Sequence, residues 1–187
     1  MAFLILHGLE GSGPEHWQTW LAGRLRQRGL AASYPSLPDA EHPRLDRWLS
    51  TLGSELERLP PAETTVLCHS LGSLLWLHHA ARAPGVPVAR AVLVAPAQPD
   101  EDDPQSPGFR PVPLDRDGVA AAAGETLLVC STDDPWCPPD TSRRIARAIG
   151  VEIHWLEGAG HVNTDGGYGP WPALEEWIVG ARRELGD

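Results

Sequence analysis

Short apolar runs alternate with amphipathic stretches from one end of this chain to the other. The apolar runs have the length of buried β-strands and lie at 2–6, 31–34, 64–68, 91–95, 126–131 and 151–156. The longer stretches between them have helical spacing and lie at 17–28, 45–59, 71–83, 141–149 and 171–185. Strands that alternate with helices build a parallel sheet covered on both faces. The pattern therefore predicts an α/β fold.

The six expected strands are placed in the order 2-1-3-4-5-6, so the turns after the first and third strands lie side by side at the carboxyl edge of the sheet. A chain of 187 residues, 42% of them hydrophobic, is long enough for one packed core and too short for two ordinary domains. We therefore expect a single domain over residues 1–187.

The connection at 96–124 breaks the alternation. It carries prolines at 96, 99, 104, 107, 111 and 113, which exclude a regular helix from its first half. It also carries a short acidic run: Asp100, Glu101, Asp102 and Asp103. We expect an extended surface loop in which the carboxylates are solvated and do not form a metal site.

The turn after the third strand has the pattern of a nucleophile elbow. The apolar run at 64–68 stops at His-Ser-Leu-Gly, and a helical pattern begins at once. A strand that enters a helix through such a tight turn lifts the turn residue, here Ser70, above the sheet edge. Gly72 supplies one of the two small neighbours that this turn needs, and Cys68 replaces the other glycine. The alternative is an ordinary helix cap, in which the serine oxygen accepts a backbone N–H.

Two later strand ends supply partners for a nucleophilic serine. Asp133 and Asp134 follow the strand at 126–131, and we choose Asp134 as the acid because Pro135 fixes the chain direction directly after it. Asp133 is then expected to cap the next turn. His161, flanked by Gly160 in the loop after the last strand, is the expected base. The order Ser, Asp, His is the order that acyl-transfer enzymes with this kind of elbow use.

The glycine-rich turn after the first strand completes the candidate site. Its backbone can face a developing oxyanion, and the expected donors are the N–H groups of Leu9 and Leu71. The glycine spacing does not match the dinucleotide-binding motif, and no acidic residue ends the second strand. Zinc-type ligand spacing is also missing from the sequence. The chemistry requires no metal and no organic cofactor.

Three of the eight tryptophans lie within a few residues of these loops. Trp17, Trp136 and Trp171 are therefore candidates for the wall of a substrate pocket. The alternative for each is an anchor in the core or in a loop, which is the commoner use of tryptophan.

Composition narrows the choice of partners. A net charge of -10 argues against nucleic acid and anionic membranes, because both are repelled. Of the three cysteines, Cys68 and Cys130 lie inside strand-like runs, as expected for reduced thiols in a cytoplasmic protein. The first apolar run is too short for a signal peptide or a membrane span.

Five stretches together resemble a known family: His7-Gly8 with Gly11-Ser12, His16-Trp17-Gln18, His69-Ser70-Leu71-Gly72, Ser131-Thr132-Asp133-Asp134-Pro135 and Gly160-His161-Val162-Asn163. They are similar to the small serine hydrolases related to retinoblastoma-binding protein nine and bacterial YdeN, within the α/β-hydrolase superfamily. The resemblance spans almost the whole chain. It implies an α/β-hydrolase fold without a cap domain and a triad of Ser70, Asp134 and His161. An L-x-C-x-E stretch is missing from the sequence, so the retinoblastoma-protein contact is not carried over.

The sequence therefore predicts a serine hydrolase that cleaves a small-molecule ester or amide through an acyl-serine intermediate. Two alternatives stay open. One is a non-catalytic protein that binds a partner on a hydrolase fold, because fold does not guarantee function. The other is a serine peptidase for short peptides, because the sequence does not determine how the loops shape the pocket.

Overall fold

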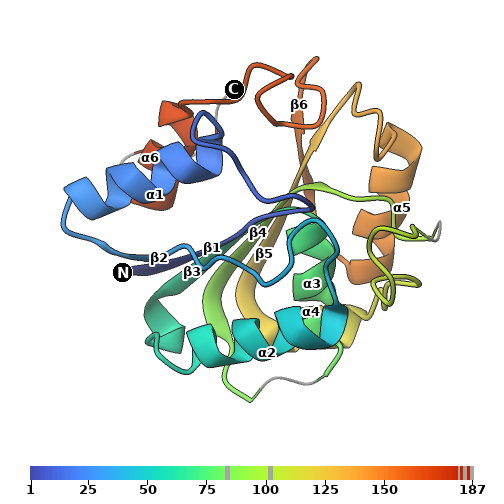
Figure 1. Cartoon of the computed structure of the whole chain (residues 1–187), viewed down its shortest axis with the longest axis horizontal. Helices are drawn as coiled ribbons and strands as arrows, with labels where there is room; N and C mark the ends of the chain where they lie inside the picture. Colours follow the sequence, from blue (N-terminus) through green and yellow to red (C-terminus); the bar gives the residue numbers. More distant parts are fainter. Residues whose placement is uncertain (83–84, 101–102, 181, 183–184, 186–187) are drawn as a thin grey trace.

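The protein is a single parallel sheet flanked by helices (Figure 1). The structure, a computed structural model, describes residues 1–82, 85–100, 103–180, 182 and 185. The strands run in the order β2-β1-β3-β4-β5-β6, and all their pairings are parallel. Their bounds are β1 (Ala2–Leu6), β2 (Ala31–Ser33), β3 (Thr64–Ser70), β4 (Val88–Pro96), β5 (Ala123–Ser131) and β6 (Ile153–Leu156). The predicted strand order is confirmed.

The helices divide between the two faces of the sheet. Figure 1 shows α1 and α6 together on one face and α2, α3, α4 and α5 on the other. Their bounds are α1 (Trp17–Gln27), α2 (Leu45–Leu56), α3 (Leu71–Ala80), α4 (Arg116–Ala122), α5 (Pro139–Ile149) and α6 (Pro172–Ile178); a short 3-10 helix, η1 (Pro61–Glu63), precedes β3.

The strands are apolar on both faces because both faces are covered. In β1, Leu4 and Leu6 join the core cluster under α2, α3, α4 and α5, whereas Phe3 and Ile5 join the cluster under α1 and α6. Successive side chains of a strand point to opposite faces, so a strand buried on both sides reads as a continuous apolar run. This is why the sequence shows apolar runs here in place of alternation.

Several helix ends differ from the prediction. Helix α2 ends at Leu56, and α3 ends at Ala80, while residue 83 of the predicted range lies outside the described residues. Helix α6 is also shorter than 171–185, of which residues 181, 183 and 184 lie outside the description. Gly180 follows it with φ 76°, a left-handed conformation that glycine adopts at helix ends.

The connection at 96–124 is not a loop throughout, which corrects the prediction. Its second half forms α4, and residues 123–124 already belong to β5. Asp115 caps α4 by accepting the backbone N–H groups of Asp117 and Gly118. A capping aspartate followed by an alanine-rich stretch is a helix signal that the prediction overlooked. Two acidic positions of the run, Glu101 and Asp102, lie outside the described residues.

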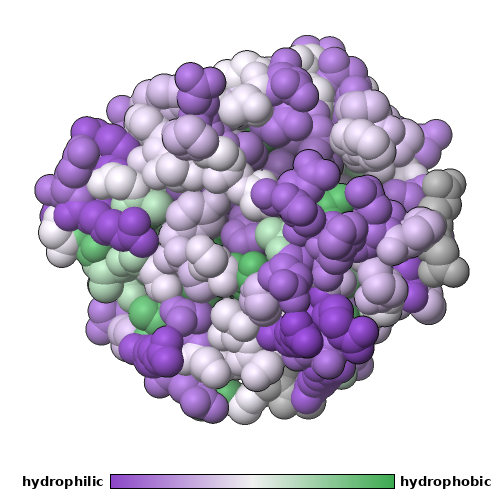
Figure 2. Space-filling view, in the orientation of Figure 1, coloured by the Kyte–Doolittle hydropathy of each residue, from purple (hydrophilic) through white to green (hydrophobic). Residues whose placement is uncertain are grey.

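The surface in the orientation of Figure 1 is mostly hydrophilic. Figure 2 shows hydrophobic residues on this face as small spots between hydrophilic ones. None of the described helices is long and apolar enough to cross a membrane.

Candidate active site

The site is built on the tight turn between β3 and α3. Ser70 occupies this turn with φ 51° and ψ −119°, a conformation that is rare for a residue with a side chain and marks local strain. Its side chain makes no capping hydrogen bond to α3. The helix-cap alternative is therefore wrong for Ser70, whose hydroxyl instead lines a cavity at the carboxyl edge of the sheet.

Two glycines allow the backbones to approach each other around Ser70. A Cβ atom on Gly72 would lie 2.6 Å from the carbonyl oxygen of Leu6, at the end of β1. A Cβ atom on Gly8 would lie 2.8 Å from the Cβ atom of Ser70. Both positions exclude any larger residue unless the backbone moves. Cys68 is fully buried in the core cluster and pairs with Leu6 across the sheet, so the turn forms without the other glycine.

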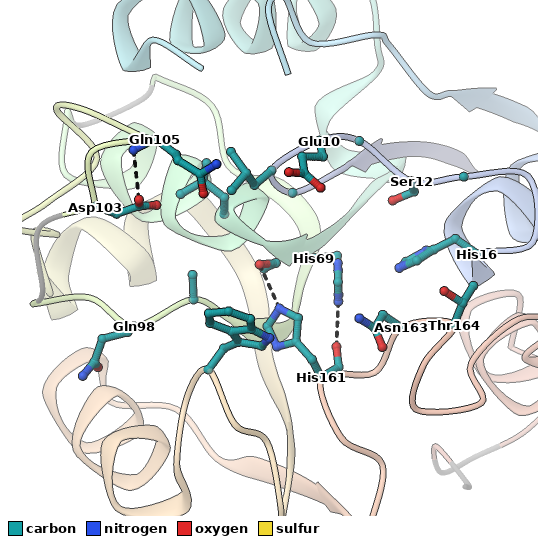
Figure 3. A pocket seen from close by; sticks show the side chains of 18 of the residues that line it. Glu10, Ser12, His16, His69, Gln98, Asp103, Gln105, His161, Asn163 and Thr164 are labelled. Atoms are coloured by element: carbon teal, nitrogen blue, oxygen red, sulfur yellow. Dashed lines mark hydrogen bonds between the residues drawn. The ribbon is translucent and has the colours of Figure 1, made fainter. Parts of the chain in front are cut away.

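A continuous hydrogen-bonded chain connects Ser70, His161 and Asp134. The His161 Nε2 atom lies 2.9 Å from the Ser70 Oγ atom, and Nδ1 lies 2.9 Å and 3.0 Å from the two carboxylate oxygens of Asp134. Because a carboxylate accepts hydrogen bonds, Nδ1 carries the proton and Nε2 is left to accept from the serine hydroxyl. The hydrogen bond between the imidazole of His161 and the Ser70 hydroxyl is one of the dashed lines in Figure 3.

Asp134, the expected acid, is buried, and backbone groups of the turn that follows it hold its carboxylate. Asp134 is 4% exposed. Its Oδ1 atom also accepts the backbone N–H groups of Trp136, at 2.8 Å, and Cys137, at 3.3 Å. These bonds compensate a buried carboxylate and fix its orientation toward His161.

Three consecutive side chains at the carboxyl end of β5, from Ser131 to Asp133, hold the loop that carries His161. Each accepts a backbone N–H of that loop: Thr132 from Gly158 at 3.1 Å, Ser131 from Ala159 at 2.9 Å and Asp133 from Gly160 at 2.7 Å. Asp133 also accepts from the Ser131 hydroxyl at 2.7 Å, and these hydrogen bonds lower the pKa of its carboxyl. The expectation that Asp133 caps the following turn is wrong, because its oxygen points across to the neighbouring loop.

The first glycine-rich turn is oriented by His7. This buried ring lies 2.8 Å, through Nδ1, from the Gly8 carbonyl oxygen, and its Nε2 atom accepts the Leu37 N–H at 3.0 Å. Burial lowers the pKa of His7, which favours the neutral ring that this arrangement needs. Since the carbonyl and N–H of a trans peptide point in opposite directions, a Gly8 carbonyl bound by His7 directs the Leu9 N–H the other way.

Two further histidines form a row with His161. The His69 ring centroid lies 4.9 Å from that of His16 and 5.0 Å from that of His161. The His69 Nε2 atom lies 2.9 Å from the backbone carbonyl oxygen of His161 and donates to it. Burial, together with the neighbouring rings, lowers the pKa of His69 well below its usual value and that of His16 to about 4. Both rings are therefore neutral at pH 7.

These buried neutral rings predict that stability falls on mild acidification. An unfolded histidine takes up a proton near pH 6.5, whereas His16 and His69 resist protonation in the folded chain. The stabilisation that each neutral ring adds to the free energy of unfolding is complete above about pH 6.5. It is lost as the pH falls toward 4, at up to about 1.4 kcal/mol per pH unit for each ring. Urea denaturation at pH 7.5, 6.5, 5.5 and 4.5 measures this slope.

His16→Asn keeps a side-chain acceptor at the start of α1 and removes the titrating ring, so the slope should become shallower. His42→Asn, at an exposed position, is the matched control. A free energy of unfolding that is constant from pH 7.5 to 4.5 would contradict the prediction.

The cavity beside Ser70 has a volume of about 470 Å³. It is lined by Gly8, Leu9, Glu10, Gly11, Ser12, Gly13, His16, His69, Ser70, Leu71, Ala97, Gln98, Asp103, Gln105, Arg110, Trp136, His161, Asn163 and Thr164. Figure 3 shows His69 and His161 near the middle of these residues, with Ser12, His16, Asn163 and Thr164 on one side and Gln98, Asp103 and Gln105 on the other. Both expected oxyanion donors, Leu9 and Leu71, are among them.

The three candidate tryptophans have different positions. Trp136 lines the cavity, is 66% exposed and lies with its ring centroid 6.5 Å from that of His161. Trp17 and Trp171 are buried against each other in the core cluster under α1 and α6, which corrects their assignment to the pocket wall. Trp17 holds the loop that carries His161, since its Nε1–H donates to the Val162 carbonyl oxygen at 3.0 Å.

Sequence reasoning missed several residues of the cavity. His16 was named only within a stretch that resembles the family and was given no role, because it precedes a helix and does not follow a strand. The connection after β4 contributes Ala97, Gln98 and Gln105, which the description as a surface loop did not anticipate. The prolines excluded a helix but did not indicate that this segment packs beside the cavity.

The described residues contain no cluster of three or more His, Cys, Asp or Glu side chains that could hold a metal ion. The cysteines are free and buried, and burial raises the pKa of Cys130 to about 12 and that of Cys137 to about 11. Thiols with such pKa values are weak nucleophiles and weak metal ligands at neutral pH.

The sheet order and the elbow define the α/β-hydrolase fold. The chain belongs to the serine hydrolase family, whose model matches residues 3–179. It is 27% identical to YdeN of Bacillus subtilis over 182 residues, which cover 94% of this chain and 93% of YdeN.

Solved structures share the fold. The crystal structure of the Bacillus subtilis ydeN product matches with a TM-score of 0.84 and 24% identity, covering 98% of this chain and 99% of that one. A YdeN-like protein of Pectobacterium atrosepticum matches with a TM-score of 0.76 and 24% identity, covering 95% and 89%. The monoacylglycerol lipase of Paleococcus ferrophilus matches with a TM-score of 0.61 and 20% identity, covering 96% and 94%.

Proposed function

We propose that this chain hydrolyses small esters through an acyl-serine intermediate, with Ser70 as nucleophile, His161 as base and Asp134 as acid. The observation that carries the proposal is the hydrogen-bonded chain of these three side chains, which ends at a strained serine open to the cavity. Chains of this kind activate serine on several unrelated folds. An amide with a good leaving group fits the same chemistry.

The reaction has two halves. The Ser70 oxygen attacks the ester carbonyl carbon while His161 Nε2 takes the hydroxyl proton, and the N–H groups of Leu9 and Leu71 stabilise the oxyanion. The C–O bond to the alcohol then breaks, and His161 returns the proton to the leaving oxygen. Water, activated by the same imidazole, attacks the acyl-serine and releases the acid. Asp134 keeps the proton on Nδ1 and stabilises the imidazolium.

The backbone donors are supported by local structure. Leu71 is the first residue of α3, where an N–H has no partner within the helix and the helix dipole is positive. Leu9 follows the Gly8 carbonyl, which His7 and the Gly11 N–H both bind. These contacts favour two fixed donors on the Ser70 side of the cavity.

A fluorophosphonate probe tests the proposal directly, because it reacts with an activated serine and reports its position. We expect a single labelled peptide that contains Ser70. Ser54→Ala, at an exposed serine of α2, serves as the control and should be labelled like the wild type. Absence of labelling, or labelling at another residue, would overturn the assignment.

The cavity also predicts a preference for short acyl chains. Each methylene contributes about 0.8 kcal/mol only where protein covers it, and a chain that leaves the cavity gains nothing more. Most of the residues that line the cavity are glycines or carry polar side chains. We therefore expect turnover of the acetyl and butyryl p-nitrophenyl esters and little or none of the palmitoyl ester, measured below the micellar concentration.

A value of kcat/KM that continues to rise with chain length would contradict this expectation. It would mean that a further element, such as a second subunit, covers the acyl chain. The exposed Trp136 is the residue to test in that case, because its ring borders the cavity.

A further inference from the structure

One side of the cavity is lined by polar side chains without charge. We call it the polar wall and define it as Ser12, His16, Asn163 and Thr164. In Figure 3 these four labelled residues gather on one side of His69, away from Gln98, Asp103 and Gln105. The wall joins the turn before α1 to the loop that carries His161. None of its members belongs to the proposed triad.

His16 presents a fixed N–H to the cavity. The Gln18 backbone N–H donates to its Nδ1 atom at 3.2 Å, so in the neutral ring the proton is on Nε2. The residue is only 5% exposed, and Figure 3 shows its ring directed toward the interior of the cavity. A cap for α1 requires one acceptor, which Ser, Asp or Asn would supply. The imidazole does more, because it adds a second nitrogen that reaches the cavity.

Ser12 complements this donor with an acceptor. Its hydroxyl proton is donated to the Gln18 Oε1 atom at 2.8 Å, and Gln18 is itself oriented by donating from Nε2 to the Leu6 carbonyl oxygen at 2.9 Å. The remaining lone pairs of the Ser12 oxygen can therefore only accept.

Asn163 adds a second donor. Its Oδ1 atom accepts the Gly166 N–H at 3.1 Å, which leaves the amide N–H groups for the cavity. The wall thus offers donors from His16 and Asn163 and an acceptor from Ser12 within one part of the site.

A hydroxyl group matches this set because it both donates and accepts. A carboxylate only accepts, so it could not bind Ser12, and the nearby Glu10 carboxylate would repel it. An ammonium group only donates, so it could not pair with His16 or Asn163. The positive charge of Arg110 is opposed by Asp103, 3.7 Å away. Neutral hydroxylated compounds therefore fit the wall better than ions.

The wall also lies where a leaving alcohol must extend. His161 returns its proton to the leaving oxygen, so the alcohol is placed against this imidazole, and Asn163 and Thr164 follow His161 in the same loop. We propose that the polar wall binds further hydroxyl groups on the alcohol part of the ester, so that esters of polyols are preferred substrates. This specificity rests on the ester hydrolysis proposed above.

Glycerol monoacetate and propyl acetate test the proposal, because they share the acyl group and a three-carbon alcohol and differ in two hydroxyl groups. We expect kcat/KM of the wild type to be about tenfold or more higher for glycerol monoacetate, the factor that one or two hydrogen bonds supply. In His16→Asn, which keeps the helix cap, and in Asn163→Ala, which removes the amide donor without adding a charge, the ratio should fall toward one. His42→Asn is the matched control and should keep the ratio of the wild type.

Equal kcat/KM values for the two esters, or a preference for propyl acetate, would contradict the proposal that the polar wall binds substrate hydroxyl groups. The assignment of ester hydrolysis would then still stand. A wild-type preference that both wall variants retain would contradict the same proposal. If neither ester is hydrolysed, the polyol preference is wrong, and fluorophosphonate labelling then decides whether the nucleophile assignment fails with it.

Discussion

Ser70→Ala is expected to abolish fluorophosphonate labelling and to lower kcat for a short ester by about 10⁴- to 10⁶-fold, as the loss of the nucleophile does in other triads. The hydroxyl is the group that bonds to the substrate carbonyl, and no neighbouring side chain can replace it. Cys68, the nearest thiol in sequence, is fully buried. Burial raises the pKa of this thiol above its usual value, so it is a weak nucleophile at neutral pH. The measurement is a steady-state assay of the purified variant together with mass mapping of the probe.

The fold of this variant should be intact, because alanine is smaller than serine and leaves the packing of α3 unchanged. Circular dichroism and urea denaturation check this point. Ser54→Ala provides the control for loss of a serine elsewhere. Labelling or turnover that survives in Ser70→Ala would place the nucleophile at a different residue and would remove the basis of the proposed mechanism.

The second large effect is expected at Asp134. Both of its carboxylate oxygens lie within 3.0 Å of the His161 Nδ1 atom. In Asp134→Asn an amide N–H can face Nδ1, which favours the imidazole tautomer that cannot accept the serine proton. The equivalent change in a serine protease lowers kcat by about 10⁴-fold. We expect a loss of about 10³- to 10⁴-fold in kcat with little change in KM.

Asp133→Asn is the matched comparison because the two residues are adjacent and the substitution is the same. Asp133 accepts from Gly160 and Ser131 through one oxygen, which asparagine retains. The loss should therefore stay within about tenfold, at least ~10²-fold smaller than for Asp134→Asn. Equal losses, or a larger loss at Asp133, would reverse the assignment of the acid. Parallel measurement of kcat and KM for both variants provides the comparison.

The fold was predictable to a large extent because the sheet is buried on both faces. Such strands are short and uniformly apolar, and the helices between them have clear helical spacing, so local pattern reveals the element type. The predicted positions of all six strands overlap the observed ones. Helix α4 was overlooked because proline density in the first half of the connection drew attention away from Asp115 and the alanines that follow it.

The candidate site was predictable where a residue's position follows from the end of a strand. In a parallel sheet the carboxyl ends of neighbouring strands share one edge, so Ser70, Asp134 and His161 were expected together, and the structure brings them within hydrogen-bonding distance. Their catalytic roles remain a prediction that the two variants above test. Trp17 and Trp171 were misplaced because nearness in sequence to a loop does not determine on which side of the backbone a large ring packs.

By itself the sequence indicated the strands, most of the helices, the serine at the elbow and the chain order Ser70, Asp134, His161 of the candidate catalytic residues. These features depend on residues a few positions apart, whose spacing sets hydrogen bonding and burial locally. Only the tertiary structure decided that Asp134 faces His161 while Asp133 holds the Gly160 backbone, and that the ring of His16 reaches the cavity. Those outcomes depend on how loops distant in sequence pack against each other, and no local pattern encodes the direction in which their side chains point.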